Sequence, residues 1–339
     1  MKILVAMSGG VDSAVAALLL KKTGHTPVGI TAKLCAATPE QDLVDAESVA
    51  RALGIEHHIV DLEKEFHQLV VEPFVECYDR GLTPNPCALC NQKIKFGLLW
   101  DYMEQFGCHA FATGHYARIG ERNGTKCLLR ARDLTRDQSY FLAYLKKEQL
   151  EKLHLPLGDY TKDEVRKIAL EAKIQVAHKS DSQDICFVPN GDYGKVLEKI
   201  GLRHSHVGNF ELQDGTKIGK HKGMAYYTIG QRKGLGIAWE HPLYVIAKDL
   251  GRNALVLGTN EDLFKKELVA GSLHFINPVP DEFSCYAKIR YRALAASCKV
   301  KICSARAKVE FLEPQRAITA GQQIVFYQED EILGGGVIL

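Results

Sequence analysis

The chain has 339 residues, 46% of them hydrophobic and 25% charged, which is ordinary for a globular protein and sufficient for two or three domains. Its 43 basic and 41 acidic side chains leave a formal net charge of only +2, so a polyanionic partner must meet a local basic patch. No apolar run reaches membrane-spanning length, and the strand-like start leaves no room for a signal or transit peptide. With ten cysteines and no secretory signal, we expect a cytoplasmic protein with no membrane partner.

The first 200 residues alternate between strand-like and helical patterns. Strand-like apolar runs lie at Ile3–Met7, Val28–Leu34, His57–Leu62 and His109–Thr113. Helical spacing is found at Ala14–Leu20, at Asp42–Leu53 with a stop at Gly54, at Lys93–Phe106, and after the capping-box pair Thr161 and Glu164. Arg118–Arg130 is typical of a hairpin that turns at Asn123-Gly124. This alternation predicts an α/β fold with a parallel sheet covered by helices.

Beyond about residue 200 the helical periodicity gives way to short apolar or alternating runs. These runs lie at Tyr244–Ala247, Ala254–Leu257, Tyr286–Arg292, Lys299–Cys303 and Ile324–Tyr327, with a linker around Asn277-Pro278 and Pro280. We therefore expect a catalytic α/β domain at 1–200, a central β-rich adaptor domain at 201–275 and a C-terminal β-barrel-like domain at 276–339.

The turn Ser8-Gly9-Gly10 joins the first strand to the first helix. Bare backbone N–H groups and the hydroxyls of Ser8 and Ser13 at a helix start can hold an anion, and glycine lets the backbone approach it closely. The loop lacks the lysine of a Walker A loop and the spacing of G-x-G-x-x-G. A plain strand-to-helix turn with an N-cap is the alternative for these three residues alone.

Two segments carry cysteines in settings that favour chemistry. Cys87 and Cys90 form a C-x-x-C in "TPNPCALC", a loop bracketed by prolines, and Cys186 lies in "DICF". A C-x-x-C is also half of a zinc site, but no second pair with metal-ligand spacing follows. A helix that begins near Cys90 would lower its pKa and favour the thiolate. The other seven cysteines are predicted to be small buried side chains.

The whole string S-G-G-x-D-S resembles the PP-loop of ATP pyrophosphatases, which cleave ATP into AMP and pyrophosphate. Further motifs follow in family order: "GLTPNPCALCNQKIKFG", "ATGHYAR", "RDQSYFL", "DSQDICFVP", "TIGQRKGLGI", "KIRYRA" and "LGGGVI". Together they resemble the bacterial tRNA 2-thiouridylases (the MnmA family) over essentially the whole chain. The resemblance implies ATP-dependent replacement of the C2 oxygen of the wobble uridine U34 by sulfur in the lysine, glutamate and glutamine tRNAs.

The resemblance also implies particular site residues. Cys90 would be the nucleophile and Cys186 the persulfide carrier, and the two can form a disulfide. The implied ATP contacts are Ala6, Met7, Ser8, Gly9, Gly10, Val11, Asp12, Ser13, Ala32 and Gly114. Ala32 stands where the family often has methionine, and Cys87 stands where many members have aspartate. We hypothesise in addition that Asp12 helps to place Mg²⁺.

The implied RNA contacts lie in several segments. Asn85, Pro86 and Cys87 would meet the target base, and the remaining tRNA contacts would be His115, Arg136, Asp137, Gln138, Arg290, Tyr291 and Gln322. The sequence itself shows a basic segment without acids at Tyr286–Val309, and a strand over Lys288–Arg292 would put three basic side chains on one face. A solvated barrel face is the alternative interpretation of this segment.

The expected partners are the anticodon stem-loops of these tRNAs and a sulfur donor. The donor would be a persulfide-carrying relay protein or a cysteine desulfurase. Two other functions are considered: a PP-loop amide or argininosuccinate-type ligase, which needs no paired thiols, and a tRNA-binding protein without catalysis, which needs no intact loop.

Overall fold

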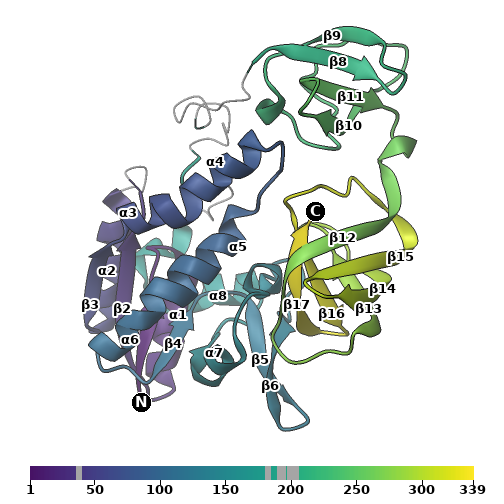
Figure 1. The fold of residues 1–339 in the computed structure, drawn as a ribbon. Helices are drawn as coiled ribbons and strands as arrows, with labels where there is room; N and C mark the ends of the chain where they lie inside the picture. The colour runs from purple at the N-terminus through teal and green to yellow at the C-terminus, as the bar shows by residue number, and fades with distance from the viewer. Residues whose placement is uncertain (36–39, 180–184, 189–195, 197–205) are drawn as a thin grey trace.

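The computed structural model describes residues 1–35, 40–179, 185–188, 196 and 206–339. The described strands form three sheets, and Figure 1 shows them as an α/β part, a small β unit and a C-terminal barrel. Cys186 lies within the described residues, whereas residues 180–184 of its motif do not. None of the helices described here combines the length and apolar character that crossing a bilayer requires.

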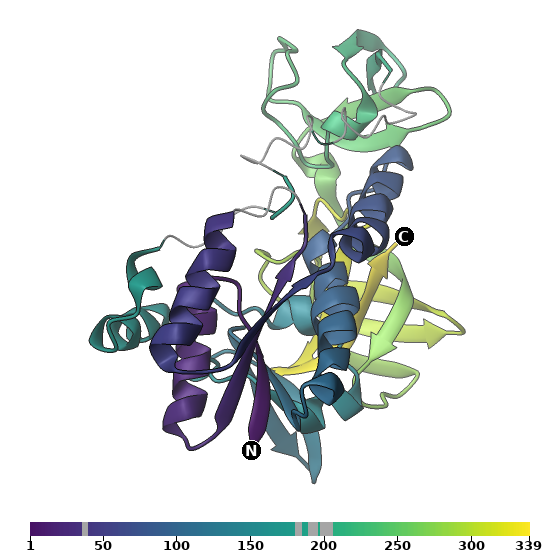
Figure 2. The same ribbon diagram turned by 90° about the vertical axis from the view of Figure 1, so that its left-hand side faces the viewer.

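The first sheet is parallel throughout, as the alternation of strands and helices predicted. Its order is β3 (His57–Asp61), β2 (Thr26–Lys33), β1 (Lys2–Ala6), β4 (Ala110–Thr113) and β7 (Leu153–His154). Ile3 and Val5 face a core formed with α1 (Val11–Lys22), α2 (Glu40–Leu53) and α8 (Lys162–Glu171), while Leu4 faces the opposite core. Helices thus cover both faces of the sheet (Figure 2), as buried parallel strands require.

Two helical runs cover the second face of this sheet. One consists of α3 (Glu63–Phe66), η1 (His67–Val71) and α4 (Glu72–Asp79), and the other of α5 (Pro86–Cys90), η2 (Asn91–Leu98) and α6 (Leu99–Gln105). The first run was not predicted. The second begins at Pro86, whereas its helical spacing was recognised only from Lys93. Shorter elements complete this part: η3 (Ser139–Leu142), α7 (Lys147–Lys152) and η4 (Gln175–His178).

Two local predictions are confirmed in detail. The hairpin of β5 (Ala117–Arg122) and β6 (Thr125–Arg130) turns at Asn123 and Gly124, whose φ angles are 51° and 71°. The hydroxyl of Thr161 accepts a hydrogen bond from the Glu164 N–H at 3.3 Å. The Glu164 carboxylate accepts one from the Thr161 N–H at 2.7 Å, which completes the capping box of α8.

The small β unit is a four-stranded sheet. It runs in the order β10 (Tyr244–Asp249), β11 (Ala254–Gly258), β8 (Gly208–Leu212) and β9 (Lys217–His221). Phe210, Val245, Leu255 and Leu257 form the centre of its separate core. Two short helices belong to the same stretch or follow it: η6 (Met224–Tyr226) and η7 (Glu261–Leu263).

The C-terminal barrel is antiparallel and closed. Its strands are β12 (Phe264–Phe275), β15 (Arg306–Arg316), β14 (Ala296–Cys303), β13 (Glu282–Lys288), β16 (Gln323–Gln328) and β17 (Glu331–Ile338), and β12 also pairs with β17. Because β12 is a barrel strand, the sheets divide the chain before Phe264, whereas the sequence placed this boundary at 275–276. The strand expected over Tyr286–Arg292 ends at Lys288.

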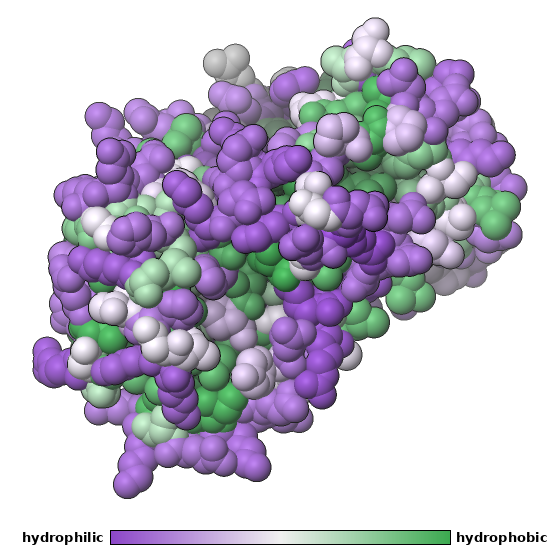
Figure 3. Space-filling model, turned by 90° about the horizontal axis from the view of Figure 1, so that it is seen from below, coloured by the Kyte–Doolittle hydropathy of each residue, from purple (hydrophilic) through white to green (hydrophobic). Residues whose placement is uncertain are grey.

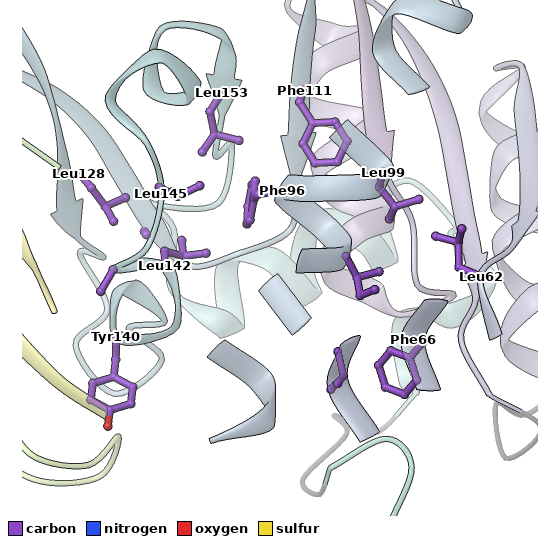
Figure 4. Close-up of a cluster of buried hydrophobic side chains, with 14 of the residues drawn as sticks. Leu62, Phe66, Phe96, Leu99, Phe111, Leu128, Tyr140, Leu142, Leu145 and Leu153 are labelled. Carbon is purple, nitrogen blue, oxygen red and sulfur yellow. The ribbon is translucent and has the colours of Figure 1, made fainter. Parts of the chain in front are cut away.

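The α/β part and the barrel share a core. Strand β6 of the hairpin pairs with β17, so the barrel sheet continues into β6 and β5. Val325, Tyr327 and Ile332 of the barrel belong to the same buried cluster as Leu128 and Phe111. Figure 4 shows the part of this cluster that runs from Phe66 and Leu99 to Leu128 and Tyr140. Outside the cores, the face seen in Figure 3 is mainly hydrophilic, with hydrophobic residues in patches between.

Candidate functional site

The glycine turn lies at the carboxyl edge of the parallel sheet. Strands β2 and β4 flank β1 on opposite sides, so the order of connection reverses there, and open α/β sheets bind ligands at such a point. The turn follows β1, Gly114 follows β4, and Ala32 is the penultimate residue of β2. Three predicted nucleotide contacts from different parts of the chain are thus at one edge.

Close backbone packing shapes this edge. Gly9 has a φ of +68°, and a Cβ there would lie 2.2 Å from the Asp42 carbonyl oxygen. A Cβ on Gly114 would lie 2.8 Å from the Ser13 nitrogen. The buried Ser13 hydroxyl accepts from the Ser8 N–H at 3.1 Å and donates to the Gly10 carbonyl at 3.1 Å. Glycine is therefore required at both positions, and the loop is pre-formed.

Asp12, in the first turn of α1, is held by two donors. The buried Lys162 ammonium donates to both carboxylate oxygens at 2.8 and 2.9 Å, and the Tyr116 hydroxyl donates at 2.8 Å. An ammonium against the carboxylate opposes a second cation. The arrangement does not fit the hypothesis that Asp12 is a Mg²⁺ ligand. It places a positive charge beside the loop instead.

Lys179 is a second ammonium group at the loop, and it is paired with two carboxylates. Its ammonium donates to the Gly9 carbonyl at 3.1 Å, to Asp42 at 2.7 Å and to Asp45 at 2.5 Å. Burial disfavours the Asp45 carboxylate, but the hydrogen bonds from Lys179 and Gln41 prevail and lower its pKa. Lys179 therefore ties α2 to the loop from the end of η4. Neither Lys162 nor Lys179 was recognised from the sequence, because the capping box and the cysteine motif beside them do not indicate that these lysines reach a loop far away in the chain.

The three cysteines that the sequence singled out for chemistry, Cys87, Cys90 and Cys186, lie in one cluster. Helix α5 begins at Pro86, with the Asn85 side chain accepting from the Ala88 N–H at 3.3 Å, and it carries Cys87 and Cys90 three residues apart on one face. Phe187 is buried against Phe66 of α3 and Phe74 of α4, with ring centroids 5.7 and 5.1 Å apart, which anchors its neighbour Cys186 to this helical run. The Cys90, Cys35 and Cys87 thiols each raise the pKa of Cys186, as close neighbours do. We call these four residues the thiol cluster.

The thiols are not pre-ionised. Burial raises the pKa of Cys90 to about 11. Burial and the neighbouring thiols raise the pKa of Cys186 to about 12, although part of its surface remains exposed. The prediction that a helix start lowers the pKa of Cys90 is therefore wrong: the helix begins four residues earlier, and desolvation dominates. In the part of the chain that the structure describes, no three His, Cys, Asp or Glu side chains are grouped to hold a metal ion.

Among the described residues, Lys95 is the one cation that changes the pKa of all three of these thiols, Cys87, Cys90 and Cys186. It lowers the pKa of Cys87, Cys90 and Cys186 against the effect of burial. Lys95 lies five residues after Cys90 in the π-helical segment η2, where i→i+5 hydrogen bonds place residues five apart on one face. π-Helical segments are frequent at functional sites.

Three of the predicted RNA contacts, Arg136, Asp137 and Tyr291, line a groove between the α/β part and the barrel. A groove of about 870 Å³ is lined by Arg130, Leu134, Thr135, Arg136, Asp137, Tyr286, Lys288, Tyr291, Arg292, Ala293, Leu294, Ala295 and Glu329. Tyr291 packs on Phe141, with ring centroids 4.5 Å apart. Arg290 lies beside the groove and donates to the Arg316 carbonyl at 2.9 Å.

Two of the predicted RNA contacts face inward. The Asp137 side chain is buried and accepts from the Ala131 and Ser139 N–H groups at 3.1 and 3.2 Å and from Arg130 at 3.2 Å, so it shapes this loop from within. Burial, with Lys95 nearby, lowers the pKa of His115 well below its usual value, so the ring is neutral at pH 7. His115 Nδ1 lies 2.8 Å from the Thr113 hydroxyl.

The basic stripe predicted along Lys288–Arg292 is wrong. Lys288 is buried at the end of β13, and the following residues form a loop, so the three basic side chains do not share a strand face. The run expected at Lys299–Cys303 does lie in a strand, β14, in which Lys299 and Lys301 are exposed on either side of buried Val300. Lys301 is paired with Glu282 and Lys308 with Glu267, which neutralises part of this face.

Gln322 joins the barrel to the loop before α5. Its side-chain amide donates to the Thr83 carbonyl at 2.8 Å and to the Pro84 carbonyl at 3.2 Å. The Thr83 N–H donates to the Ala320 carbonyl at 3.0 Å. The predicted base-contact residues Asn85, Pro86 and Cys87 are therefore positioned by the barrel as well as by their own helix.

Comparisons with known proteins cover the whole of this architecture. The family model described as "tRNA methyl transferase HUP domain" matches residues 1–190, more than half of the chain, and the PRC-barrel and "aminomethyltransferase beta-barrel" models match residues 197–259 and 265–338. A protein of Pelobacter propionicus named tRNA-specific 2-thiouridylase MnmA is 47% identical over 348 residues, spanning all of this chain and 97% of that protein. A Treponema denticola protein of the same name is 44% identical over 357 residues, spanning 100% and 98%. The chain belongs to the MnmA family.

Among solved structures, U34-tRNA thiolase NcsA of Methanococcus maripaludis matches with a TM-score of 0.39 and 20% identity, over 59% of this chain and 65% of that one. A 4-thiouridine synthetase–RNA complex matches with a TM-score of 0.38 and 19% identity, over 55% and 44%. The MnmA family assignment confirms the predicted fold class, a HUP-type parallel-sheet domain followed by two β-rich domains, and its PP-loop ancestry implies the use of ATP.

Three residues near the predicted site carry small side chains or thiols. Ala32 leaves a small side chain at the end of β2, and Cys87 carries a thiol on α5. Cys35, which the sequence suggested was merely buried, is only half-buried and belongs to the thiol cluster. Its signal was absent from the sequence, because only the pairing of β2 beside β1 brings its segment to this edge. Cys303, also expected to be buried, is exposed at the end of β14.

Proposed function

We propose that this protein catalyses the ATP-dependent 2-thiolation of U34 in the lysine, glutamate and glutamine tRNAs. The products are 2-thiouridine, AMP and pyrophosphate. The observation that carries the proposal is the thiol cluster, which contains Cys90 and Cys186, in a chain that also has a pre-formed glycine loop with Lys162 and Lys179 packed against it. A ligase or a methyltransferase needs no such pair of thiols, and membership of the MnmA family supports the same reaction.

The loop would serve the first step, in which the C2 oxygen of the uridine attacks the α-phosphate of ATP and pyrophosphate leaves. Ala6–Ser13, Ala32 and Gly114 are the proposed nucleotide contacts. Lys162 and Lys179 would offset negative charge at the polyphosphate, which is the contribution that fixed cations make to phosphoryl transfer. Because Asp12 is already paired, we retain Mg²⁺ only as the counter-ion that ATP brings with it.

The cysteines would serve the second step. The terminal sulfur of a Cys186 persulfide attacks C2, and the adenylated oxygen leaves as AMP. The Cys90 thiolate then attacks the Cys186 sulfur, so the S–S bond breaks, 2-thiouridine is released and a Cys90–Cys186 disulfide remains. We propose this order, in which the persulfide attacks C2 before Cys90 breaks the S–S bond.

The groove and the Gln322 contact would serve RNA binding. Asn85, Pro86 and Cys87 would meet the extruded base, since chemistry at C2 requires a base removed from its stack. Arg136, Gln138, Arg290, Tyr291 and Gln322 would line the path of the anticodon stem-loop. Asp137 and His115 would act indirectly, by holding the loops that carry their neighbours. The sulfur donor would be a relay protein or a cysteine desulfurase.

The experiment that tests the function incubates the protein with ATP, a persulfide donor and transcribed tRNA, and measures 2-thiouridine by mass spectrometry together with AMP. We expect both products with U34, neither with a C34 tRNA, and no 2-thiouridine after Cys90→Ser or Cys186→Ser. Cys303→Ser, at an exposed cysteine on the barrel, is the matched control and retains activity. Full thiolation by Cys186→Ser would refute the scheme, and AMP release driven by an amino acid instead of tRNA would favour the ligase.

A further inference from the structure

The proposed reaction ends in a disulfide that blocks its own repetition. Each turnover consumes the persulfide and leaves Cys186 joined to Cys90, so Cys186 cannot accept new sulfur until that bond is broken. A third thiol, Cys87, lies on the same face of α5 as Cys90. The following inference rests on the proposed function.

We propose that Cys87 is a resolving thiol that frees Cys186 after each turnover. The Cys87 thiolate attacks the Cys90 sulfur, the Cys90–Cys186 bond breaks, and Cys186 leaves as a thiolate that can be loaded again. The exchange transfers one disulfide to the Cys87–Cys90 pair and requires no outside oxidant or reductant. A protein dithiol then reduces Cys87–Cys90 and becomes a disulfide itself.

Position favours Cys87 over the other neighbour, Cys35. Cys87 is exposed and shares a short, capped helix with Cys90, whereas Cys35 follows β2 and packs against the main core. An external dithiol can therefore reach a sulfur of the Cys87–Cys90 pair. Two effects act on the pKa of Cys87. Desolvation by the surrounding protein raises it, and the charge of Lys95 lowers it. The other three thiols of the cluster raise the pKa of Cys186, and Lys95 lowers it.

The spacing of the pair suits the chemistry. A C-x-x-C in which both thiols lie on one helical face forms a small disulfide loop and is the arrangement of protein disulfide oxidoreductases. Attack on Cys90 is the productive direction, because it is the one that returns Cys186 for loading. Attack on Cys186 would instead form a Cys87–Cys186 bond and leave the carrier blocked.

The test maps disulfides by peptide mass spectrometry after acid quenching and alkylation. In one arm, the full-length protein is oxidised with one equivalent of diamide, without ATP or tRNA. In the other, persulfide-loaded protein is given ATP and U34 tRNA for a single turnover, and 2-thiouridine is counted in the same sample. We expect Cys87–Cys90 to be the dominant disulfide in both arms, and Cys90–Cys186 to accumulate at least tenfold more in Cys87→Ser.

The controls separate this inference from the function itself. Cys303→Ser has the wild-type disulfide pattern, and treatment with a protein dithiol makes Cys87 and Cys90 available for alkylation again, whereas Cys186 is available before that treatment. Thiolated tRNA with a persistent Cys90–Cys186 bond in the wild-type protein would overturn the role of Cys87 while the function stands. A Cys87–Cys186 or Cys35–Cys186 bond, or thiolation without any disulfide, would overturn it equally. Absence of 2-thiouridine, with the exchange intact in the diamide arm, would instead refute the function.

Discussion

Lys95 and Lys93 lie two residues apart in η2, but only Lys95 acts on the thiols; Lys93 is exposed. We expect Lys95→Met to raise the pKa of Cys90 further, because the opposing charge is lost while desolvation remains. Alkylation of Cys90 by iodoacetamide at pH 8 should then slow roughly threefold to tenfold, since a pKa change of about 0.5–1 alters the thiolate fraction by that factor. Lys95→Arg should restore the rate, and Lys93→Met should leave it unchanged.

The same thiols predict a pH profile. Because Cys90 has a pKa of about 11, its thiolate fraction rises about tenfold for each pH unit between pH 7 and pH 10. The alkylation rate of the tRNA-free protein should follow this slope and level off only near pH 11. A plateau reached by pH 8 would contradict the burial seen here. Cys303 on the exposed barrel edge serves as the internal reference for reagent decay.

Lys162 and Asp12 form the second residue-level test. Lys162→Met leaves a carboxylate one-third exposed without its ammonium, for which we expect about 1–3 kcal/mol of lost stability in urea unfolding. ATP-dependent AMP formation should fall by more than tenfold. Adding Asp12→Asn should recover stability but not AMP formation, because the charge at the loop is still missing. Recovery of both would mean that Lys162 only neutralises Asp12.

At the scale of elements, the β1–α1 turn depends on Gly9. Gly9→Ala forces an alanine into φ +68° and against the Asp42 carbonyl. The backbone strain is about 1–2 kcal/mol, and the overlap adds about 1–3 kcal/mol. Gly124→Ala in the β5–β6 turn is the matched control, because its φ is +71° and its Cβ would meet open space. Unfolding free energies that fall equally in the two variants would show that the packing of the loop is unimportant.

Elements were predictable where local signals were strong. The capping box at Thr161, the Asn-Gly turn and the alternation around Val300 all specify structure within a few residues, and the structure has them. The helical run from Glu63 to Asp79 lacked a clear start signal and was missed. The strand expected beyond Lys288 was wrong for another reason: an alternating pattern of basic residues fits an exposed strand, but Lys288 is buried at the end of β13 and the residues after it form a loop.

At the scale of the whole molecule, Gln322 connects the barrel to the base-contact loop. Gln322→Ala removes two hydrogen bonds, which costs about 1–2 kcal/mol. We expect KM for tRNA to rise severalfold while ATP affinity in a direct binding assay stays the same. The exposed Gln328 at the end of β16 provides the control substitution. A loss of ATP affinity would place Gln322 in general folding rather than in RNA positioning.

RNA binding through the groove should be salt-dependent. Arg292→Ala removes an exposed groove charge, so the slope of log K against log salt should become shallower by about one unit. Lys301→Ala should change the slope much less, because Glu282 already neutralises that lysine. Filter binding of an anticodon stem-loop between 50 and about 300 mM salt measures both. Equal slopes in the two variants would move the RNA path away from the groove.

The thiol cluster could be predicted only in part from the sequence. Motifs identified Cys90, Cys186 and the glycine loop, because chemistry leaves recognisable spacing. The roles of Cys35, Lys162 and Lys179 could not be found in this way, nor could that of Lys95, although Lys95 lies within the motif that carries Cys90. Their roles arise from long-range packing, namely the π-helical turn, the end of β2 and the docking of η4 and α8 on the loop, and no local pattern encodes those contacts.

The β5–β6 hairpin, which extends the barrel sheet from within the α/β part, has a consequence for any attempt to dissect the protein. A cut between Gly258 and Phe264 would leave β6 as an open edge without β17 and would uncover Leu128, while the freed barrel would lose the cover of β6 over Ile332. Open edges and bared apolar side chains favour aggregation. The isolated pieces should therefore precipitate when produced alone and become soluble together only if co-expression lets the two halves reassemble.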